Sequence, residues 1–494
     1  MIQASGAEPG DGDRSGAVET HISVVVFLGD RAFKFPKPVR FAFLDQSTPA
    51  RRAEACAREV ELNRRLAPDV YLGTGELRVD GDTVEHCIVM RRMPAERALS
   101  LIVQTTDGRD EVRAVARRLT AFHAGAERNA RIDAAGDPEA VWGLWSDNLA
   151  ELDADPAAAR SGPELARVGR LARRYLAGRA PLLRRRQADG LIRDGHGDLL
   201  ADDIYCLDDG PRILDCLAFA DQLRYGDVLL DVAFLAMDLE CQGREDLAEL
   251  LLAAYTEFSD EHHPPSLAHH YIAYRALVRA KIAWLRVPTE GAEAEVEAEA
   301  LLHRCGQHLE SARVRLVLVG GPPGTGKSSL ARRLGDRRGW TVLSSDETRK
   351  ERAGRGRTER GGDELDEGMY EPAATADTYR TLIDRARQVL ELGGSVVVDA
   401  SWGRADDRAR AAQLAADTDS DLAELQCVCP PGLVEERVRR RRLAADDASD
   451  ADEELARRLA ERFAAWPTAD PVDTAVAPDR VLDAALAVLD RNDR

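Results

Sequence analysis

The sequence predicts a two-domain protein in which an α+β half is followed by an α/β half. Three observations lead to this prediction. Strand signals with a single helix fill residues 19–94, stretches of helical spacing fill 95–286, and strand and helix signals alternate over 313–494. A chain of 494 residues is too long for one hydrophobic core. Regular alternation of strands and helices predicts a parallel sheet with right-handed crossovers.

The first lobe is predicted from its turn chemistry. Residues 1–18 are acidic and glycine-rich, and we expect them to form a disordered tail. Two strand-type runs, 22–28 and 31–35, are separated only by Gly29 and Asp30, which is a hairpin signal. The other elements expected in this lobe are a helix over 50–66 and strands over 75–79 and 84–91.

The second lobe, residues 95–286, is predicted to be mostly helical because its Ala, Arg and Leu residues recur at helical spacing. Short strands and loops are expected between Gly190 and Asp221. An acidic, Ala-rich helix within 287–312 is expected to link this half to the next. The helices predicted in the lobe cover 112–127, 139–152, 164–186, 227–237, 246–258 and 267–285.

A phosphate-binding loop opens the last domain. Residues 321–328 fit the spacing G-x-x-x-x-G-K-S, between an apolar strand over 314–320 and a helix. Such a loop turns successive backbone N–H groups toward a phosphate at the helix N-terminus. We expect Lys327 to reach the β- and γ-phosphates of ATP and Ser328 to hold Mg²⁺. The residues expected to contact nucleotide here are Gly321, Pro322, Pro323, Gly324, Thr325, Gly326, Lys327, Ser328 and Ser329.

Acidic residues follow the later strands of this domain. Asp346 comes directly after a strand, so it can take a proton from an acceptor hydroxyl while Arg349 holds a substrate anion. The alternative is a helix-capping Asp346 with a solvent-facing Arg349. Asp399 ends an apolar strand and is expected to support Mg²⁺ through water. The further strands predicted in the domain are 341–345, 395–400, 423–429 and 472–475.

An arginine-rich helix is a candidate lid. Every residue from 437 to 442 is Arg except Val438. We expect a lid near 437–460 in which Arg437 and Arg441 neutralise the transferring phosphoryl group. The alternative is an ordinary solvated surface.

A second constellation lies in the first half of the chain. The run Gly195-His196-Gly197-Asp198 is followed by Asp203 and, after a short strand, by Asp215. Carboxylates on adjacent short loops suit metal-assisted phosphoryl transfer, because Mg²⁺ requires hard oxygen ligands.

These residues resemble the catalytic loop of the aminoglycoside phosphotransferase family, which has a protein-kinase-like fold, and the resemblance covers about residues 19–286. It implies a bilobal domain with Asp198 as the catalytic base. It implies Asp203 and Asp215 as metal ligands, although the family carries Asn where this chain has Asp203. It also implies a phosphate-binding Lys34 with Glu59 as its ion-pair partner.

Two further features bear on this resemblance. Asp227 and Asp231 are similar to the family's later acidic element, which braces the catalytic loop. A glycine-rich G-x-G-x-x-G loop does not precede Lys34, which leaves open a degenerate module that binds or regulates without catalysing.

Residues 313–494 resemble P-loop kinases of the gluconate-kinase, polynucleotide-kinase and zeta-toxin types. Together the resemblances imply ATP- and Mg²⁺-dependent phosphoryl transfer to a small-molecule hydroxyl, such as a sugar or aminoglycoside-like acceptor. Three alternatives stay open: a nucleotide-gated regulator, a polynucleotide 5′-kinase or toxin-like kinase, and an aminoglycoside-resistance enzyme.

Composition and charge narrow the classes of binding partner and the cellular compartment that we expect. The net charge of -19 argues against broad binding to nucleic acid and would tolerate a cationic substrate. The sequence lacks a run of about 18 apolar residues, so a membrane span is not expected. The first residues lack a signal-peptide pattern, and the eight cysteines are scattered without zinc spacing, which favours the cytoplasm.

Overall fold

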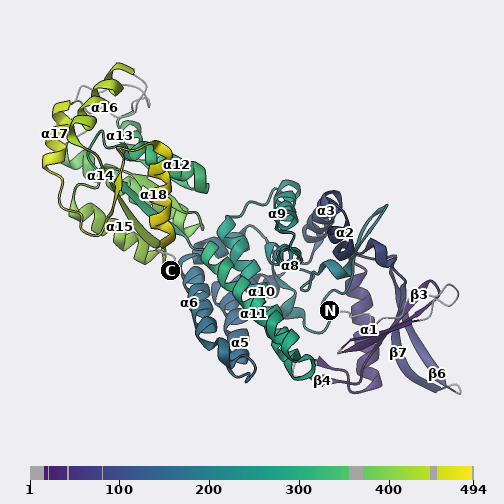
Figure 1. Ribbon diagram of the computed structural model, residues 1–494. Helices are drawn as coiled ribbons and strands as arrows, with labels where there is room; N and C mark the ends of the chain where they lie inside the picture. The colour runs from purple at the N-terminus through teal and green to yellow at the C-terminus, as the bar shows by residue number, and fades with distance from the viewer. Residues whose placement is uncertain are drawn as a thin grey trace. The chain divides into compact units, whose positions relative to one another are not determined.

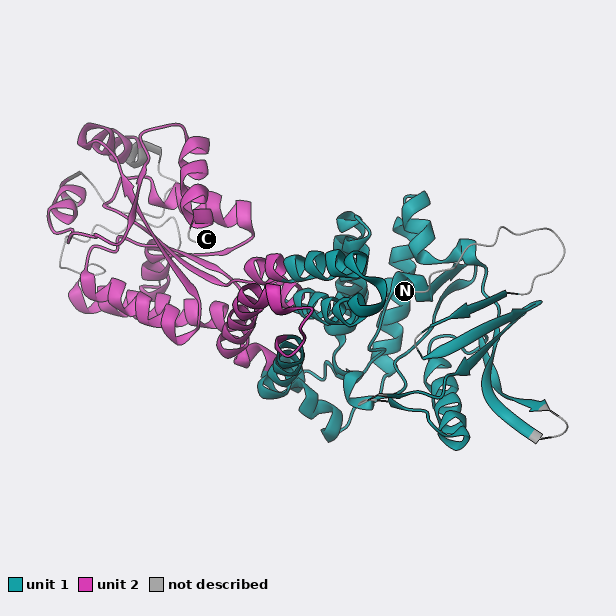
Figure 2. Ribbon diagram, turned by 60° about the horizontal axis from the view of Figure 1, so that its bottom comes forward, with its two compact units in different colours: residues 1–152, 184–263, 271–305 teal, residues 153–183, 264–270, 306–494 magenta. Residues whose placement is uncertain are grey.

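The computed structural model describes residues 16–20, 22–41, 44–79, 82–354, 371–444 and 453–491. Chain contacts divide it into two compact units (Figure 2). Unit 1 consists of residues 1–152, 184–263 and 271–305, and unit 2 consists of residues 153–183, 264–270 and 306–494. The predicted fold class is confirmed at the level of architecture: an α+β part, with an antiparallel sheet and a mostly helical lobe, is followed in the sequence by an α/β domain with a parallel sheet that carries the G-x-x-x-x-G-K-S loop.

The first lobe of unit 1 is a five-stranded antiparallel sheet in the order β1-β2-β3-β7-β6. The hairpin predicted at Gly29 is confirmed, since Leu28 pairs with Arg31 and Gly29 has a φ of 60°. Pairing already begins at Gly16, ahead of the boundary expected at residue 19. The strands are β1 (Gly16–Glu19), β2 (Ser23–Leu28), β3 (Arg31–Pro36), β6 (Tyr71–Val79) and β7 (Asp82–Arg91), with a short pair β4 (Arg40–Phe41) and β5 (Leu44–Asp45).

One helix, α1 (Pro49–Asn63), packs on this sheet. It begins at Thr48, whose hydroxyl accepts the N–H of Arg51, and Pro49 occupies its first turn. Its buried face carries Cys56 and Val60, which pack with Ile88 of β7. Burial of this face fixes α1 on the sheet, so that Glu59 is brought to the strand that carries Lys34.

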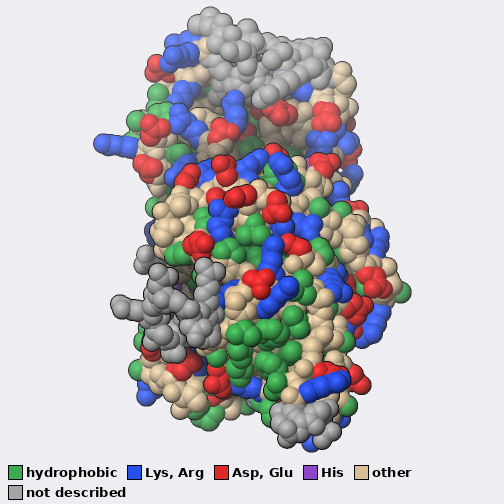
Figure 3. Space-filling model, turned by 90° about the vertical axis from the view of Figure 1, so that its right-hand side faces the viewer, with side chains coloured by type: hydrophobic (Ala, Val, Ile, Leu, Met, Phe, Trp, Pro, Cys, Tyr) green, Lys and Arg blue, Asp and Glu red, His purple; other side chains and the backbone are tan. Residues whose placement is uncertain are grey.

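The sheet also exposes apolar side chains to solvent. Leu28, Leu72, Leu77 and Val84 are all more than a third exposed. Figure 3, which looks at this side of the molecule, shows hydrophobic side chains gathered on its surface.

The second lobe of unit 1 is mostly helical (Figure 1). Two antiparallel strand pairs, β8 with β11 and β9 with β10, carry the loops that hold the predicted acidic residues. The strands are β8 (Ile192–Asp194), β9 (Ile204–Leu207), β10 (Gly210–Ile213) and β11 (Tyr225–Asp227). The helices that lie wholly or partly in this lobe are α2 (Leu99–Thr105), α3 (Arg109–Gly125), α4 (Ala130–Asp133), α5 (Pro138–Asp153), α7 (Ala180–Ala188), α8 (Val228–Cys241), α9 (Glu245–Ser259), α10 (Pro265–Glu290) and α11 (Ala292–Ser311).

One predicted helix is divided. The spacing predicted a single helix over 164–186, but the structure has α6 (Gly162–Gly178) and α7 with a break at Arg179. The Arg179 side chain is buried and donates to the carbonyl oxygen of Thr418. A tertiary contact of this kind cannot be read from helical periodicity. Residues 153–183, which include α6, belong to unit 2 by their contacts.

Unit 2 is built on a five-stranded parallel sheet in the order β13-β14-β12-β15-β16, as the alternating pattern predicted. The strands are β12 (Arg315–Gly320), β13 (Thr341–Ser344), β14 (Val396–Asp399), β15 (Asp421–Val428) and β16 (Asp470–Asp473). The helices of this domain are α12 (Lys327–Arg338), α13 (Ser345–Arg352), α14 (Pro372–Glu391), α15 (Ala405–Asp417), α16 (Pro431–Ala444), α17 (Glu453–Glu461) and α18 (Pro478–Arg491).

The core of unit 2 places the phosphate-binding loop. Leu330 and Leu334 of α12 pack with Val481 and Val488 of α18 and with β12. Strand β12 is central, since it pairs with both β14 and β15, and its apolar side chains are buried. Placing the loop after a central strand brings the carboxyl ends of the neighbouring strands around it.

Two predictions concern the chain as a whole: its domain boundaries and the expectation that it does not span a membrane. The domain boundaries at residues 94, 286 and 312 stay a proposal. Among the helices of the described part, none is long and apolar enough to cross a membrane.

Candidate active sites

The phosphate-binding loop of unit 2 connects the end of β12 at Gly320 to the start of α12 at Lys327. Gly324 has a φ of 86°, and a Cβ added there would lie 2.8 Å from Val434. Both the backbone conformation and the close approach therefore require glycine at this position.

Two threonines and an arginine hold this loop in place. The Thr325 hydroxyl donates to the Pro322 carbonyl at 2.7 Å, and the Thr474 hydroxyl donates to the Thr325 carbonyl at 2.6 Å. Arg437 of α16 donates to the Thr474 carbonyl at 2.6 Å. Thr474 could not be predicted from the sequence, because the pairing of β15 with β16 in the sheet is what brings it to the loop.

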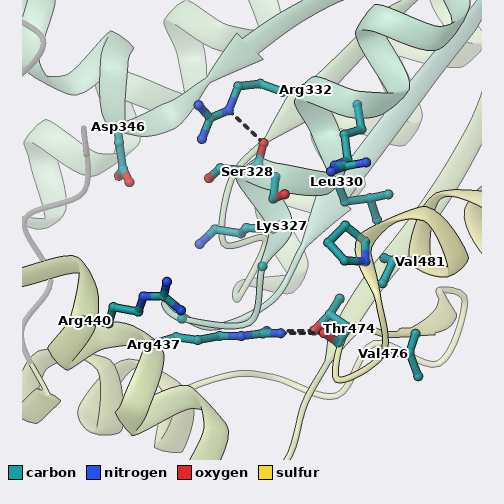
Figure 4. Close-up of a pocket in the computed structure, with 15 residues that line it drawn as sticks. Lys327, Ser328, Leu330, Arg332, Asp346, Arg437, Arg440, Thr474, Val476 and Val481 are labelled. Atoms are coloured by element: carbon teal, nitrogen blue, oxygen red, sulfur yellow. Dashed lines mark hydrogen bonds between the residues drawn. The ribbon is translucent and has the colours of Figure 1, made fainter. Parts of the chain in front are cut away.

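A cavity of about 460 Å³ opens beside the loop. Figure 4 shows Lys327 extending into the space between Ser328, Asp346 and Arg440. Arg440 was not predicted as a site residue, because it stands in a run of arginines and the sequence does not distinguish it from its neighbours. The polar side chains that line the cavity are Lys327, Ser328, Ser329, Arg332, Arg333, Asp346, Arg437, Arg440 and Thr474.

Asp399 lies at the end of β14, next to the loop strand, and its side chain is 5% exposed. Burial raises its pKa to about 6, although the Lys327 charge and the Ser328 hydroxyl oppose the rise. Its Oδ1 atom has no hydrogen-bond partner among the described residues. A buried carboxylate oxygen without a partner beside a serine hydroxyl fits an Mg²⁺ ion.

Asp346 and Arg349 sit on α13, which begins at the Ser344 cap. Asp346 lines the cavity, as expected of a residue near the acceptor. Arg349 Nη1 donates to Asp346 Oδ1 at 2.9 Å, so the arginine orients the carboxylate. Arg349 is not among the residues that line this cavity. The two predicted residues are thus brought together, and their roles stay predictions.

The predicted lid is only partly within the described residues. Arg437 and Arg440 come from α16, while the Arg441 side chain and residues 445–452 lie outside the described part. Two tyrosines before Asp399, Tyr370 and Tyr379, suggest from the sequence either the lining of an acceptor pocket or core packing, and Tyr370 also lies outside the described part. Tyr379, the other candidate, is buried and its hydroxyl contacts Ser401 Oγ at 3.0 Å, which is a packing role.

In unit 1, the loop around Asp198 is held by a buried carboxylate. Asp231 accepts the N–H of His196 at 2.6 Å and that of Gly197 at 2.9 Å. A Cβ at Gly195 would lie 2.2 Å from Asp231 Oδ2, so only glycine allows this approach. Burial alone would raise the pKa of Asp231, but the hydrogen bond from His123 and the other donors hold it well below its usual range.

His196 completes this support. Its Nε2 atom lies 2.9 Å from the Leu214 carbonyl, and its Nδ1 accepts the N–H of Asp198 at 3.3 Å. Burial lowers the pKa of His196 to about 4, so the ring is neutral at pH 7. The neutral ring can donate at one nitrogen and accept at the other, which is what these two contacts require.

The three predicted carboxylates of unit 1, on Asp198, Asp203 and Asp215, lie close enough for their charges to shift one another's pKa values. Burial raises the pKa of Asp198 to about 6. Burial and the charges of Asp215 and Asp198 raise the pKa of Asp203 well above its usual value. Lys34 donates to Asp215 at 2.6 Å and to Glu59 at 2.8 Å. Although burial opposes it, the Lys34 charge lowers the pKa of Asp215.

A crowded group of carboxylates fits a divalent cation that has further ligands of its own. Among the described residues, three His, Cys, Asp or Glu side chains do not come together as a complete metal-binding group. Mg²⁺ takes one or two carboxylates together with phosphate oxygens and water. Asp203 and Asp215 suit such shared coordination, and so do Ser328 and Asp399 in unit 2.

Comparison with known families covers both halves. A family model described as an AAA domain matches residues 316–466. Among solved structures, a choline/ethanolamine kinase family protein from Mesorhizobium loti is 16% identical, covers 60% of this chain and 92% of its own, and has a TM-score of 0.37. The APS kinase CysC of Mycobacterium tuberculosis, in complex with AMPPNP and APS, is 22% identical, covers 36% of this chain and 98% of its own, and has a TM-score of 0.28.

Full-length similarity is much higher. The uncharacterized protein Rv2004c of Mycobacterium tuberculosis is 42% identical over 464 residues, which is 94% of this chain and 93% of that protein. The uncharacterized protein Mb2027c of Mycobacterium bovis matches to the same extent. The chain therefore belongs to the protein family of which Rv2004c is a member, and the sequence match extends over both halves of the chain.

Proposed function

We propose that the protein is an ATP- and Mg²⁺-dependent phosphotransferase that acts on the hydroxyl group of a small molecule. One observation carries this proposal. In unit 2, Lys327, Ser328 and Asp346 border one cavity, and the partnerless Oδ1 atom of Asp399 lies close by. Cation, metal ligands and candidate base are the parts that phosphoryl transfer needs, and they come together at the loop.

In this proposal, the loop amides and Lys327 hold the β- and γ-phosphates of ATP. Ser328 and Asp399 hold Mg²⁺, which when bound supplies charge neutralisation at the phosphate oxygens. Asp346 accepts the proton of the acceptor hydroxyl, whose oxygen takes the γ-phosphoryl group while ADP leaves. Arg437 and Arg440 neutralise the charge on the phosphoryl group during the transfer.

Unit 1 is proposed as a second phosphotransfer site. Lys34, oriented by Glu59, holds the α- and β-phosphates, and Asp203 and Asp215 hold Mg²⁺. Asp198 accepts the proton of the acceptor hydroxyl. Its pKa of about 6 supports this role, because the carboxyl is then largely ionised at pH 7 and still basic enough to take a proton.

The acceptor is proposed to be a sugar or a related polyhydroxylated molecule, and the site of action the cytoplasm. Broad binding to nucleic acid is not part of this proposal, given the net charge of -19.

A metabolite-extract screen with γ-labelled ATP tests the proposal. Wild type, Lys327→Ala and Asp198→Asn are compared. We expect labelled acceptor products with wild type, some lost in Lys327→Ala and others lost in Asp198→Asn. Asp208→Asn is the matched control for the second variant, since Asp208 is an exposed residue of the β9–β10 turn that pairs with Arg97.

Two outcomes would contradict the proposal. ATP turnover that releases labelled phosphate, with or without extract, would indicate a nucleotide-gated regulator instead. Label found only on an added oligonucleotide would indicate a polynucleotide kinase.

A further inference from the structure

A second cavity, of about 660 Å³, lies in unit 1 beside the loop that follows Asp198. Leu200 and Asp202 of that loop line it together with residues of α2, α8, α10 and α11. The roles proposed above do not use this cavity. Its position next to the loop of the candidate base makes it a place for the acceptor.

Two arginines one helical turn apart on α10 bear on what the cavity binds. Residues at i and i+4 share a helix face, so Arg275 and Arg279 lie on one face of α10, although only Arg279 is among the residues that line the cavity. Both guanidinium charges act on the Asp198 carboxyl. Each of them opposes the rise in the pKa of Asp198 that burial causes. Arg279 lines the cavity and is half-buried.

Arg275 is buried, and within the described residues no carboxylate forms a hydrogen-bonded ion pair with it. It is 6% exposed, and its Nε atom has no hydrogen-bond partner in the described residues. Its guanidinium lies over the rings of Phe234, at 4.6 Å, and Tyr274, at 5.6 Å. Aromatic faces attract a cation but do not replace a hydrogen-bonded anion, so a buried guanidinium of this kind is costly unless an anion joins it.

The other charged groups of the cavity are already engaged or solvated. Arg304 donates to Glu240 at 3.3 Å, and Glu297 accepts from Arg286 at 2.5 Å. Asp238 accepts the N–H of Ala201 at 2.9 Å. Asp202 is exposed, where solvent and salt screen its charge.

Arg279 differs from these groups. Within the described part of the chain it makes no hydrogen bond or ion pair, while Lys281, two residues along the same helix, pairs with Glu151 at 2.8 Å. The cavity thus presents a guanidinium that has no hydrogen-bonded partner among the described residues, although its charge opposes the rise in pKa that burial causes at Asp198 and at Asp238.

We propose that Arg279, with the charge of Arg275 behind it, binds an anionic group, a phosphate or a carboxylate, of the acceptor whose hydroxyl Asp198 activates. The proposal rests on the phosphotransferase function proposed for unit 1 and adds the substrate class. The planar guanidinium matches both anions with two parallel hydrogen bonds. An acidic acceptor is the opposite of the cationic one that the overall charge suggested, because local side chains outweigh the net charge at a binding site.

Anion binding can be measured without turnover. We would titrate inorganic phosphate, and acetate separately, into the full-length Lys327→Ala protein by calorimetry, because this background weakens the competing phosphate site of unit 2. Arg279→Gln is expected to weaken binding of one of the two anions about ten- to a hundredfold. Lys281→Gln, which removes the same charge from the same helix outside the cavity, is expected to change it less than twofold. Equal affinity in Arg279→Gln, or equal loss in Lys281→Gln, overturns the proposal.

A further arm separates the acceptor from the nucleotide as the source of the anion. With saturating AMPPNP and Mg²⁺, the anion is expected to bind as before, because the acceptor's acid group has its own position. Loss of anion binding would mean that the arginines hold the γ-phosphate of the nucleotide, and the inference about the acceptor would be wrong. Because these titrations need no catalysis, they can fail while the phosphotransfer screen succeeds, or the reverse.

Discussion

The Nζ atom of Lys34 lies 2.6 Å from Oδ1 of Asp215, although 181 residues separate the two in the chain. The same ammonium lies 2.8 Å from Glu59. Burial alone would lower the pKa of Lys34, but the charges of Asp215 and Glu59 raise it well above its usual value. Lys34 is therefore a fixed positive charge between the two lobes of unit 1, at the position where nucleotide phosphates are proposed to bind.

Replacing this lysine tests the nucleotide site of unit 1. In the Lys327→Ala background, Lys34→Met should weaken ATP binding about ten- to a hundredfold, because a charge-assisted contact to phosphate is lost. Titration with a fluorescent ATP analogue measures the affinity of each variant for nucleotide. Lys37→Met is the control, since Lys37 pairs with Glu19, whose side chain is 72% exposed. Unchanged affinity in Lys34→Met would remove this lysine from the nucleotide site.

Lys327→Ala tests the phosphate-binding loop of unit 2. Acceptor phosphorylation by this unit should fall about a hundredfold or more, because the variant lacks the cation that faces the transferring phosphoryl group. Rates of label transfer to the products found in the screen measure it. Arg338→Gln removes a cation from the same helix that pairs instead with Asp490 at 2.6 Å, and it should keep full activity.

Tyr379→Phe tests how the segment after Asp399 is held. The Tyr379 hydroxyl accepts the N–H of Trp402 at 3.1 Å and contacts Ser401 Oγ at 3.0 Å. Trp402 is buried with a φ of 53°, a conformation that this hydroxyl helps to maintain. The variant should lower the free energy of unfolding of unit 2 by about 1–2 kcal/mol, because the buried Trp402 N–H and the half-buried Ser401 hydroxyl lose a partner.

Urea unfolding followed by tryptophan fluorescence measures this loss. If Tyr379 served only to line an acceptor pocket, stability would stay the same and acceptor KM would rise.

Acidification should destabilise unit 1 through His196. Its folded-state pKa of about 4 lies below the value of about 6.5 for an unfolded histidine. The unfolded chain therefore binds the extra proton between these values, and the contribution of the neutral ring, complete above pH 6.5, is lost as the pH falls toward 4. This difference in the pKa of His196 corresponds to a loss of about 3 kcal/mol in the free energy of unfolding at the acid end of this window.

Comparison with His196→Gln isolates this effect from other titrating groups. The stability advantage of wild type over the variant should shrink between pH 6.5 and pH 4 when the unfolding of unit 1 is followed by calorimetry. A constant difference across this window would show that His196 does not carry the pH dependence.

Local patterns in the sequence determined the elements and the chemistry of single motifs. The hairpin at Gly29, the alternation of strands and helices after residue 313 and the loop ending in Lys327 all follow from turn chemistry, periodicity and spacing over a few residues. The acidic residues at strand ends were predicted for the same reason, since parallel strands end at one edge of a sheet.

Only the tertiary structure decided which side chains meet across long stretches of chain. Thr474 reaches the phosphate-binding loop because β16 pairs with β15, and Arg179 ends α6 because its side chain is buried against Thr418. Arg275 and Arg279 looked like ordinary helix residues until the packing of α10 brought them near Asp198. Propensity and spacing act between near neighbours in the chain, whereas burial and ion pairing depend on strand order and helix packing, which no short stretch of sequence contains.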